Sequence, residues 1–99
     1  MMTITREQVG TTLIISLHGK LDTFTAPVLE AEIQKGLSGV KELCWDFKDL
    51  EYLTSAGIRV LLVAENMLGD DAEMKIYHAN ENVKNAFTLT GLSSMLAEE

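Results

Sequence analysis

The stretch DFKDLEYLTSAGIRVLL, residues 46–62, carries the strongest structural signal in the chain. It opens inside the apolar and aromatic run Glu42 to Phe47, which has the length and composition of a buried parallel strand. A connection over Asp49 to Leu53 then leads to a helix that starts at Ser55 and has Gly69 as its C-cap. One broad side of that helix is apolar, formed by Ile58, Leu61, Leu62 and Leu68. A strand followed closely by a helix predicts an α/β fold.

Ser55 has two interpretations at the start of this helix. Its hydroxyl can accept hydrogen bonds from the amides of the first turn, which would make it an ordinary N-cap. A phosphoserine there would instead meet free N–H groups and the positive end of the helix dipole, and would add close to two negative charges. The small residues Ala56 and Gly57 fit either a partner that approaches closely or tight packing of the helix start. The residues alone leave these alternatives open.

Upstream, two short runs predict a β-hairpin. Thr3 to Val9 and Thr12 to Leu17 are separated only by Gly10 and Thr11. In the second run apolar and mixed positions alternate, so one face is apolar and His18 falls on the mixed face. We therefore expect this hairpin to open the sheet.

A helix is predicted between the hairpin and the Glu42 strand. It begins near Thr25, whose hydroxyl can cap the free amides, and Gly36 or Gly39 can end it. Apolar residues recur every four positions along one of its faces, at Leu29, Ile33 and Leu37.

Downstream, a further strand and helix complete the pattern. Glu73 to Ala79 alternates Met74, Ile76 and His78 with polar neighbours, and a helix from Glu81 to Thr90 is stopped by Gly91. The final LSSMLAEE allows at most a short strand or helical turn. The order ββαβαβα predicts a mixed sheet, an opening hairpin followed by parallel strands, with helices packed against it as a single domain over residues 1–99.

The acidic composition narrows the range of partners. Eight Lys and Arg stand against fifteen Asp and Glu, which gives a net charge of −7 and a field that repels phosphate backbones and anionic lipids. We therefore expect neither nucleic acid binding nor membrane insertion. A basic groove on a partner protein suits the charge, and so does a plain soluble acidic surface.

The single cysteine and the absence of an export or membrane signal indicate a cytoplasmic protein. Cys44 has no second cysteine to pair with, and its apolar surroundings predict a buried small side chain rather than a reactive thiol. No run of about 18 apolar residues and no basic segment leading into an apolar one is present.

A search for catalytic chemistry finds none. His18 and His78 have no metal-ligand partners at the usual spacings, and the dinucleotide, P-loop and nucleophile-elbow motifs do not occur. The acidic pairs Asp70 with Asp71 and Glu98 with Glu99 fit solvated ends better than an acid and base pair. We expect a non-enzymatic binding module with no catalytic residues, no metal and no cofactor.

Three segments in the right order resemble one known family. They are LIISLHGKLDTFTAPVLE at residues 13–30, DFKDLEYLTSAGIRVLL at 46–62 and VKNAFTLTGL at 83–92. Together they resemble the STAS superfamily, and within it the single-domain bacterial anti-sigma factor antagonists. The family motif commonly reads Asp-Ser-Ser-Gly, whereas this chain has Thr54, Ser55, Ala56 and Gly57.

The resemblance implies a switch. It makes Ser55 the residue phosphorylated by a partner that is both anti-sigma factor and serine kinase, with Thr54 as a second candidate acceptor. The unphosphorylated form would bind this partner and so release the sigma factor, and a phosphatase would be a further partner. The implied partner surface comprises Asp22, Thr23, Thr25, Thr54, Ser55, Ala56, Gly57 and Arg59.

Two other functions remain as alternatives. Other STAS domains are regulatory or scaffold subunits of transporters or signalling complexes without phosphorylation. Some are reported to bind small molecules or nucleotides, for which this sequence offers no glycine-rich phosphate cradle.

Overall fold

The opening β-hairpin is confirmed. In the computed structural model, which describes residues 2–92, β1 (Met2–Val9) pairs antiparallel with β2 (Thr12–Leu21), from Val9 opposite Thr12 to Met2 opposite Gly19. The turn between them needs Gly10, whose φ of 62° is a backbone conformation that residues with a side chain rarely adopt. β2 continues beyond the predicted end at Leu17, and this extension carries the chain to the candidate site.

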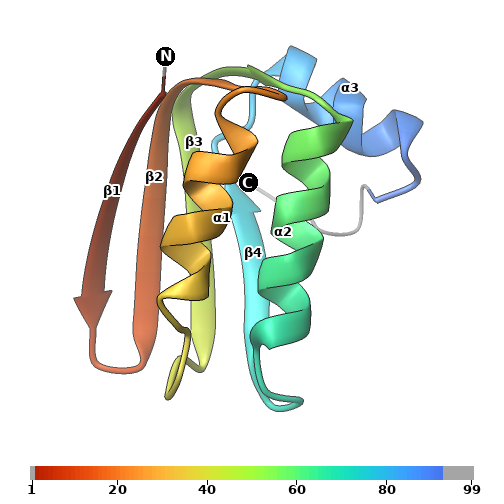
Figure 1. Ribbon diagram of the computed structural model, residues 1–99. Coiled ribbons are helices and arrows are strands. Elements are labelled where there is room, and N and C mark those ends of the chain that lie inside the picture. Colours follow the sequence, from red (N-terminus) through yellow and green to blue (C-terminus); the bar gives the residue numbers. More distant parts are fainter. Residues whose placement is uncertain (1, 93–99) are drawn as a thin grey trace.

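The predicted mixed sheet is also confirmed. β3 (Glu42–Leu53) lies parallel to both β2 and β4 (Glu73–Tyr77), so the strand order over the described residues is β1-β2-β3-β4. α1 (Ala26–Gln34) and α2 (Ser55–Met67) contact each other and cover the same face of the sheet (Figure 1). α3 (Glu81–Leu89) lies beyond the end of β4 and contacts β3 (Figure 1).

The core lies between the sheet and these helices. Alternate residues of the two central strands are almost completely buried, namely Leu13, Ile15 and Leu17 of β2 and Leu43, Trp45 and Phe47 of β3. From α1, Leu29 and Ile33 close the core, and Leu37 joins them from beyond the helix end. Cys44 points the other way and is only half-buried, so the expectation of a buried cysteine is wrong.

The prediction of a connection over Asp49 to Leu53 is wrong, because these residues continue β3. Their pairing with β2 includes irregularities, and the buried residues here are Leu50 and Leu53, three positions apart. The strict alternation that identifies a strand in a sequence is therefore lost although the strand itself goes on.

The end of α1 agrees with the prediction, whereas the end of α2 does not. α1 ends at Gln34, just before Gly36, which has a φ of 119°. α2 ends at Met67 and leaves the helix through extended backbone at Leu68, so the prediction of Gly69 as C-cap is wrong. Its apolar side also shifts: Leu62 and Leu68 are only half-buried, while Val60 and Ala64 join Ile58 and Leu61 in the core.

The last strand and helix agree closely with the sequence. β4 buries Met74 and Ile76 but ends at Tyr77, and His78 is an exposed residue with a φ of 63° rather than part of the strand. α3 ends at Leu89, ahead of Gly91 with a φ of 75°. The prediction for the tail after Leu92 lies outside the described residues. No helix among the described residues is long and apolar enough to cross a membrane.

Candidate functional site

Two loops meet at the carboxyl ends of β2 and β3. Leu21 and Leu53 are paired in the sheet, and the Thr54 N–H donates to the Leu21 carbonyl oxygen at 3.0 Å. The loop from Asp22 to Thr25 therefore lies beside the start of α2. Both helices begin at this end of the sheet (Figure 1), which brings the two groups of predicted site residues together.

The first loop is held by its own side chains. Asp22 Oδ1 accepts from the Phe24 N–H at 2.9 Å and from the Thr25 N–H at 3.0 Å. Thr25 Oγ1 accepts from the Asp22 N–H and donates to the Lys20 carbonyl oxygen, both at 2.8 Å. The backbone hydrogen bond from Thr25 is the largest of the effects that lower the pKa of Asp22 below its ordinary value. This closed set of bonds fixes the loop conformation.

The prediction that the Thr25 hydroxyl caps α1 is wrong. Thr25 occupies the N-cap position but makes no side-chain bond to the first turn, because its hydroxyl is already engaged by Lys20 and Asp22. The Asp22 carboxylate accepts from the amides that precede the helix instead. Its place ahead of the helix was visible in the sequence, but its bonding role was not.

Ser55 is the first residue of α2 and is exposed to solvent. The N-cap position belongs to Thr54, whose backbone is extended, so the interpretation of Ser55 as an ordinary N-cap is wrong. Thr54 makes no side-chain cap bond, and its Oγ1 is buried without a hydrogen-bond partner among the described residues. Of the two candidate hydroxyl-bearing residues, Ser55 is the one that faces solvent.

Gly57 is buried where the start of α2 meets the end of β2. A Cβ at this position would lie 2.6 Å from Leu21 Cγ and 2.8 Å from Leu21 Cδ2, closer than side chains pack. The absence of a side chain thus lets the helix start rest on the end of β2. Ala56 beside it is half-buried, while Thr23 in the facing loop and Arg59 one turn along α2 are exposed.

Asn80 also positions this site, although it was missed in the sequence. Its Oδ1 caps α3 by accepting from the Val83 N–H at 2.9 Å, and its Nδ2 donates to the carbonyl oxygens of Leu50 at 3.0 Å and Glu51 at 3.1 Å. One side chain therefore ties α3 to the part of β3 that leads into Ser55. An Asn directly before a helical pattern is a common N-cap, and that signal could have identified it.

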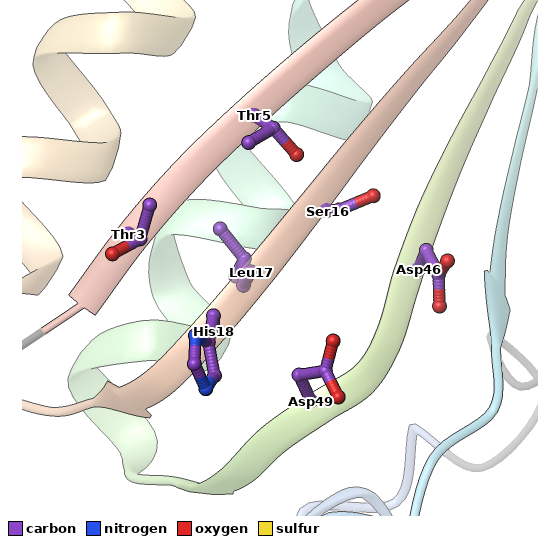
Figure 2. A pocket seen from close by; sticks show the side chains of 7 residues that line it. All are labelled: Thr3, Thr5, Ser16, Leu17, His18, Asp46 and Asp49. Carbon is purple, nitrogen blue, oxygen red and sulfur yellow. The ribbon is translucent and has the colours of Figure 1, made fainter.

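A separate hollow lies on the face of the sheet away from α2 (Figure 2). It encloses about 350 Å³ and is lined by Thr3, Thr5, Ser16, Leu17, His18, Asp46 and Asp49. Asp46 Oδ1 accepts from the Lys48 N–H at 3.0 Å and lies 3.1 Å from His78 Nδ1. Within residues 2–92 no cluster of His, Cys, Asp and Glu could hold a metal ion. None of the predicted site residues lines this hollow.

Cys44 does not have the properties of a reactive thiol. Burial raises its pKa above the ordinary value, and Glu42 nearby raises it further. The thiolate form is therefore suppressed at neutral pH.

Comparison with known proteins agrees with the sequence resemblance. Residues 3–98 match the model of the STAS domain. BtrV of Bordetella bronchiseptica, which is named as an anti-sigma factor antagonist, is 30% identical over 96 residues, covering 95% of this chain and 83% of BtrV.

Solved structures show the same fold. An anti-sigma factor antagonist from Mycobacterium paratuberculosis superposes with a TM-score of 0.89 at 24% identity, covering all of this chain and 87% of that one. The antagonist SpoIIAA in its unphosphorylated form gives a TM-score of 0.83 at 21% identity, covering 98% of this chain and 88% of that one. The protein described here belongs to the STAS domain family.

Proposed function

We propose that this protein is an anti-sigma factor antagonist and that phosphorylation of Ser55 switches its binding to the anti-sigma factor. The observation that carries the proposal is the exposure of Ser55 at the start of α2, next to a Thr54 hydroxyl that is buried. The names of BtrV and of the solved antagonists support the same function. SpoIIAA has been solved in both unphosphorylated and phosphorylated forms, which supports a phosphorylation switch.

The position of Ser55 suits a phosphate. The first amides of a helix have no partner within the helix, and the positive end of the dipole stabilises an anion there. A phosphate on Ser55 would gain these interactions without disturbing the core, since the side chain already faces solvent. The same two added charges, covered by a docked partner, would lose their water and oppose binding.

The proposed partner surface is the end of the molecule where the two loops meet. It comprises Asp22, Thr23, Thr25, Thr54, Ser55, Ala56, Gly57 and Arg59. Exposed Thr23, Ser55 and Arg59 would contact the partner directly, whereas Asp22, Thr25 and Gly57 would act by holding the backbone in place. The partner would be an anti-sigma factor that is also a serine kinase, with a phosphatase reversing the reaction. The protein itself would have no catalytic activity and would act in the cytoplasm.

Phosphorylation mapping tests the proposal. The protein is incubated with ATP and the purified anti-sigma factor serine kinase from the same genome, and its intact mass is measured. We expect one added phosphate in the wild type and in Thr54→Val, and none in Ser55→Ala. Thr54→Val is the matched control because it removes the neighbouring hydroxyl and keeps the side-chain shape. Phosphate retained in Ser55→Ala and lost in Thr54→Val would assign the switch to Thr54. A wild type that takes up no phosphate on either residue would contradict the proposed switch.

A further inference from the structure

Phe24 presents a large apolar side chain to solvent. It is 87% exposed, at the tip of the loop between β2 and α1, and Val28, four residues later in α1, is 57% exposed. Single exposed apolar residues are common and need no explanation by themselves. What distinguishes Phe24 is the structure that holds it and the surface beside it.

The loop holds Phe24 in a fixed position. The Phe24 N–H donates to Asp22 Oδ1 at 2.9 Å, and the adjoining Asp22 and Thr25 exchange the further hydrogen bonds described above. A ring on a braced backbone has only its own side-chain rotations to lose on binding, so the entropy cost of docking is small.

Phe24 also lies at the same end of the molecule as Ser55. Leu21 leads into the Phe24 loop and accepts the 3.0 Å hydrogen bond from the Thr54 N–H, directly before Ser55. A protein that covers Ser55 therefore reaches the loop that carries Phe24. The net charge of −7 opposes an anionic membrane as the occupant of this surface and favours a protein.

We propose that Phe24 is the apolar anchor of the surface around Ser55, and that its ring enters an apolar pocket of the partner protein. The inference rests on the proposed function and assigns a residue that fixes affinity for the same partner. Aromatic side chains that fill a pocket near the centre of an interface contribute most to binding. Phosphate on Ser55 and the ring of Phe24 then act on one interface with opposite effects.

Calorimetric titration of the purified kinase with matched variants tests this. Phe24→Ala should raise Kd about tenfold or more, and Phe24→Leu should raise it less. The control is Val9→Ala, which removes an apolar side chain that is 60% exposed. Val9 ends β1 and pairs with Thr12 at the start of β2, at the opposite end of that strand from the Phe24 loop. Val9→Ala should leave Kd unchanged. Phe24→Ala should raise the KM for phosphorylation of Ser55 with kcat unchanged, and it should leave the unfolding midpoint as in the wild type.

The possible results separate this inference from the proposed function. Binding of Phe24→Ala within about twofold of the wild type overturns the role of Phe24 and leaves the Ser55 switch standing. A wild type that neither binds the kinase nor is phosphorylated overturns both. The wild type could instead sediment as a dimer that Phe24→Ala abolishes, with Kd for the kinase unchanged. That result assigns the ring to a second copy of this chain and overturns the proposal. The wild type could also sediment with phosphatidylglycerol vesicles while Phe24→Ala does not, again with Kd for the kinase unchanged. That result assigns the ring to lipid and likewise overturns the proposal.

Discussion

Gly57 determines how closely α2 can start against β2. Alanine has the better helix propensity by about 1 kcal/mol, but its Cβ would overlap the branched carbon of Leu21, which is fully buried. We therefore expect Gly57→Ala to lower the free energy of unfolding by about 1–2 kcal/mol, measured by urea denaturation.

A double-mutant cycle isolates the cause of this loss. Leu21→Ala removes the atoms that the new methyl group would meet, so the cost of Gly57→Ala should largely disappear in that background. A Gly57→Ala protein more stable than the wild type would show that the helix start has room for a side chain.

Asp22 makes the stability of the folded protein depend on pH in the acid range. Its pKa is lowered in the folded protein, so its stabilising contribution is complete above the ordinary carboxyl pKa of about 3.9 and is lost as the pH falls through the lower folded pKa. The stability difference between the wild type and Asp22→Ala should therefore be constant from pH 7 to about pH 5 and shrink below about pH 4.

Asp22→Asn is the control for this titration. It keeps the accepting oxygen and does not titrate, so its difference from Asp22→Ala should not change with pH. Urea unfolding at a series of pH values measures both differences. If the free energy of unfolding falls equally in the wild type and in Asp22→Ala as the pH is lowered, the Asp22 carboxylate is not the cause of the acid destabilisation.

At the residue scale the sequence identified the right loops but not the bonding within them. Thr25 was predicted as a cap, and a cap was one of the two interpretations of Ser55, because hydroxyls before a helix usually accept from its first amides. In the structure the Thr25 hydroxyl is engaged by Lys20 and Asp22, and the N-cap of α2 is Thr54, one residue before Ser55. Competition among neighbouring polar groups decides such bonds, and spacing alone does not rank the competitors.

At the element scale, Asn80 links α3 to the end of β3. Asn80→Ala removes the cap on α3 and both donors to the Leu50 and Glu51 carbonyl groups, so it should lower the free energy of unfolding by about 1–2 kcal/mol. Asn82→Ala, an exposed change in the same helical turn, should stay within about 0.5 kcal/mol of the wild type. Urea denaturation compares them, and equal effects of the two substitutions would show that Asn80 has no special role.

The elements were predicted well where the spacing of apolar residues in the sequence matches the spacing of buried residues in the structure. The hairpin, the first half of β3 and the apolar face of α1 are of this kind. The second half of β3 was missed because Leu50 and Leu53 lie three residues apart where the sheet pairing is irregular. That segment carries the chain to Ser55, so the missed strand is part of what positions the site.

At the scale of the whole molecule, the order of elements was sufficient to predict the arrangement of the sheet. A hairpin followed by strand and helix alternation leaves few ways to pair the strands. The hollow on the other face was not predictable, because it depends on Thr5, Ser16 and Asp46 lying opposite one another on three strands. Such a row follows from strand register, which the sequence of one strand does not reveal.

The position of the two loops at one end of the sheet also explains how a change at one residue could control binding of a partner protein. α1 and α2 begin at the same end of the sheet, and the Thr54 to Leu21 hydrogen bond holds their two loops together. A partner that covers this end would enclose Ser55, and a phosphate there would have to be buried with its charge.

The most direct measurement is the affinity of the purified anti-sigma factor serine kinase for two forms of this protein. One form carries serine at position 55 and the other carries genetically encoded phosphoserine there, with all other residues identical. Burial of an uncompensated phosphate should raise Kd by about 100-fold or more, measured by isothermal titration calorimetry. Equal dissociation constants for the two forms would contradict the proposal that Ser55 is the switch.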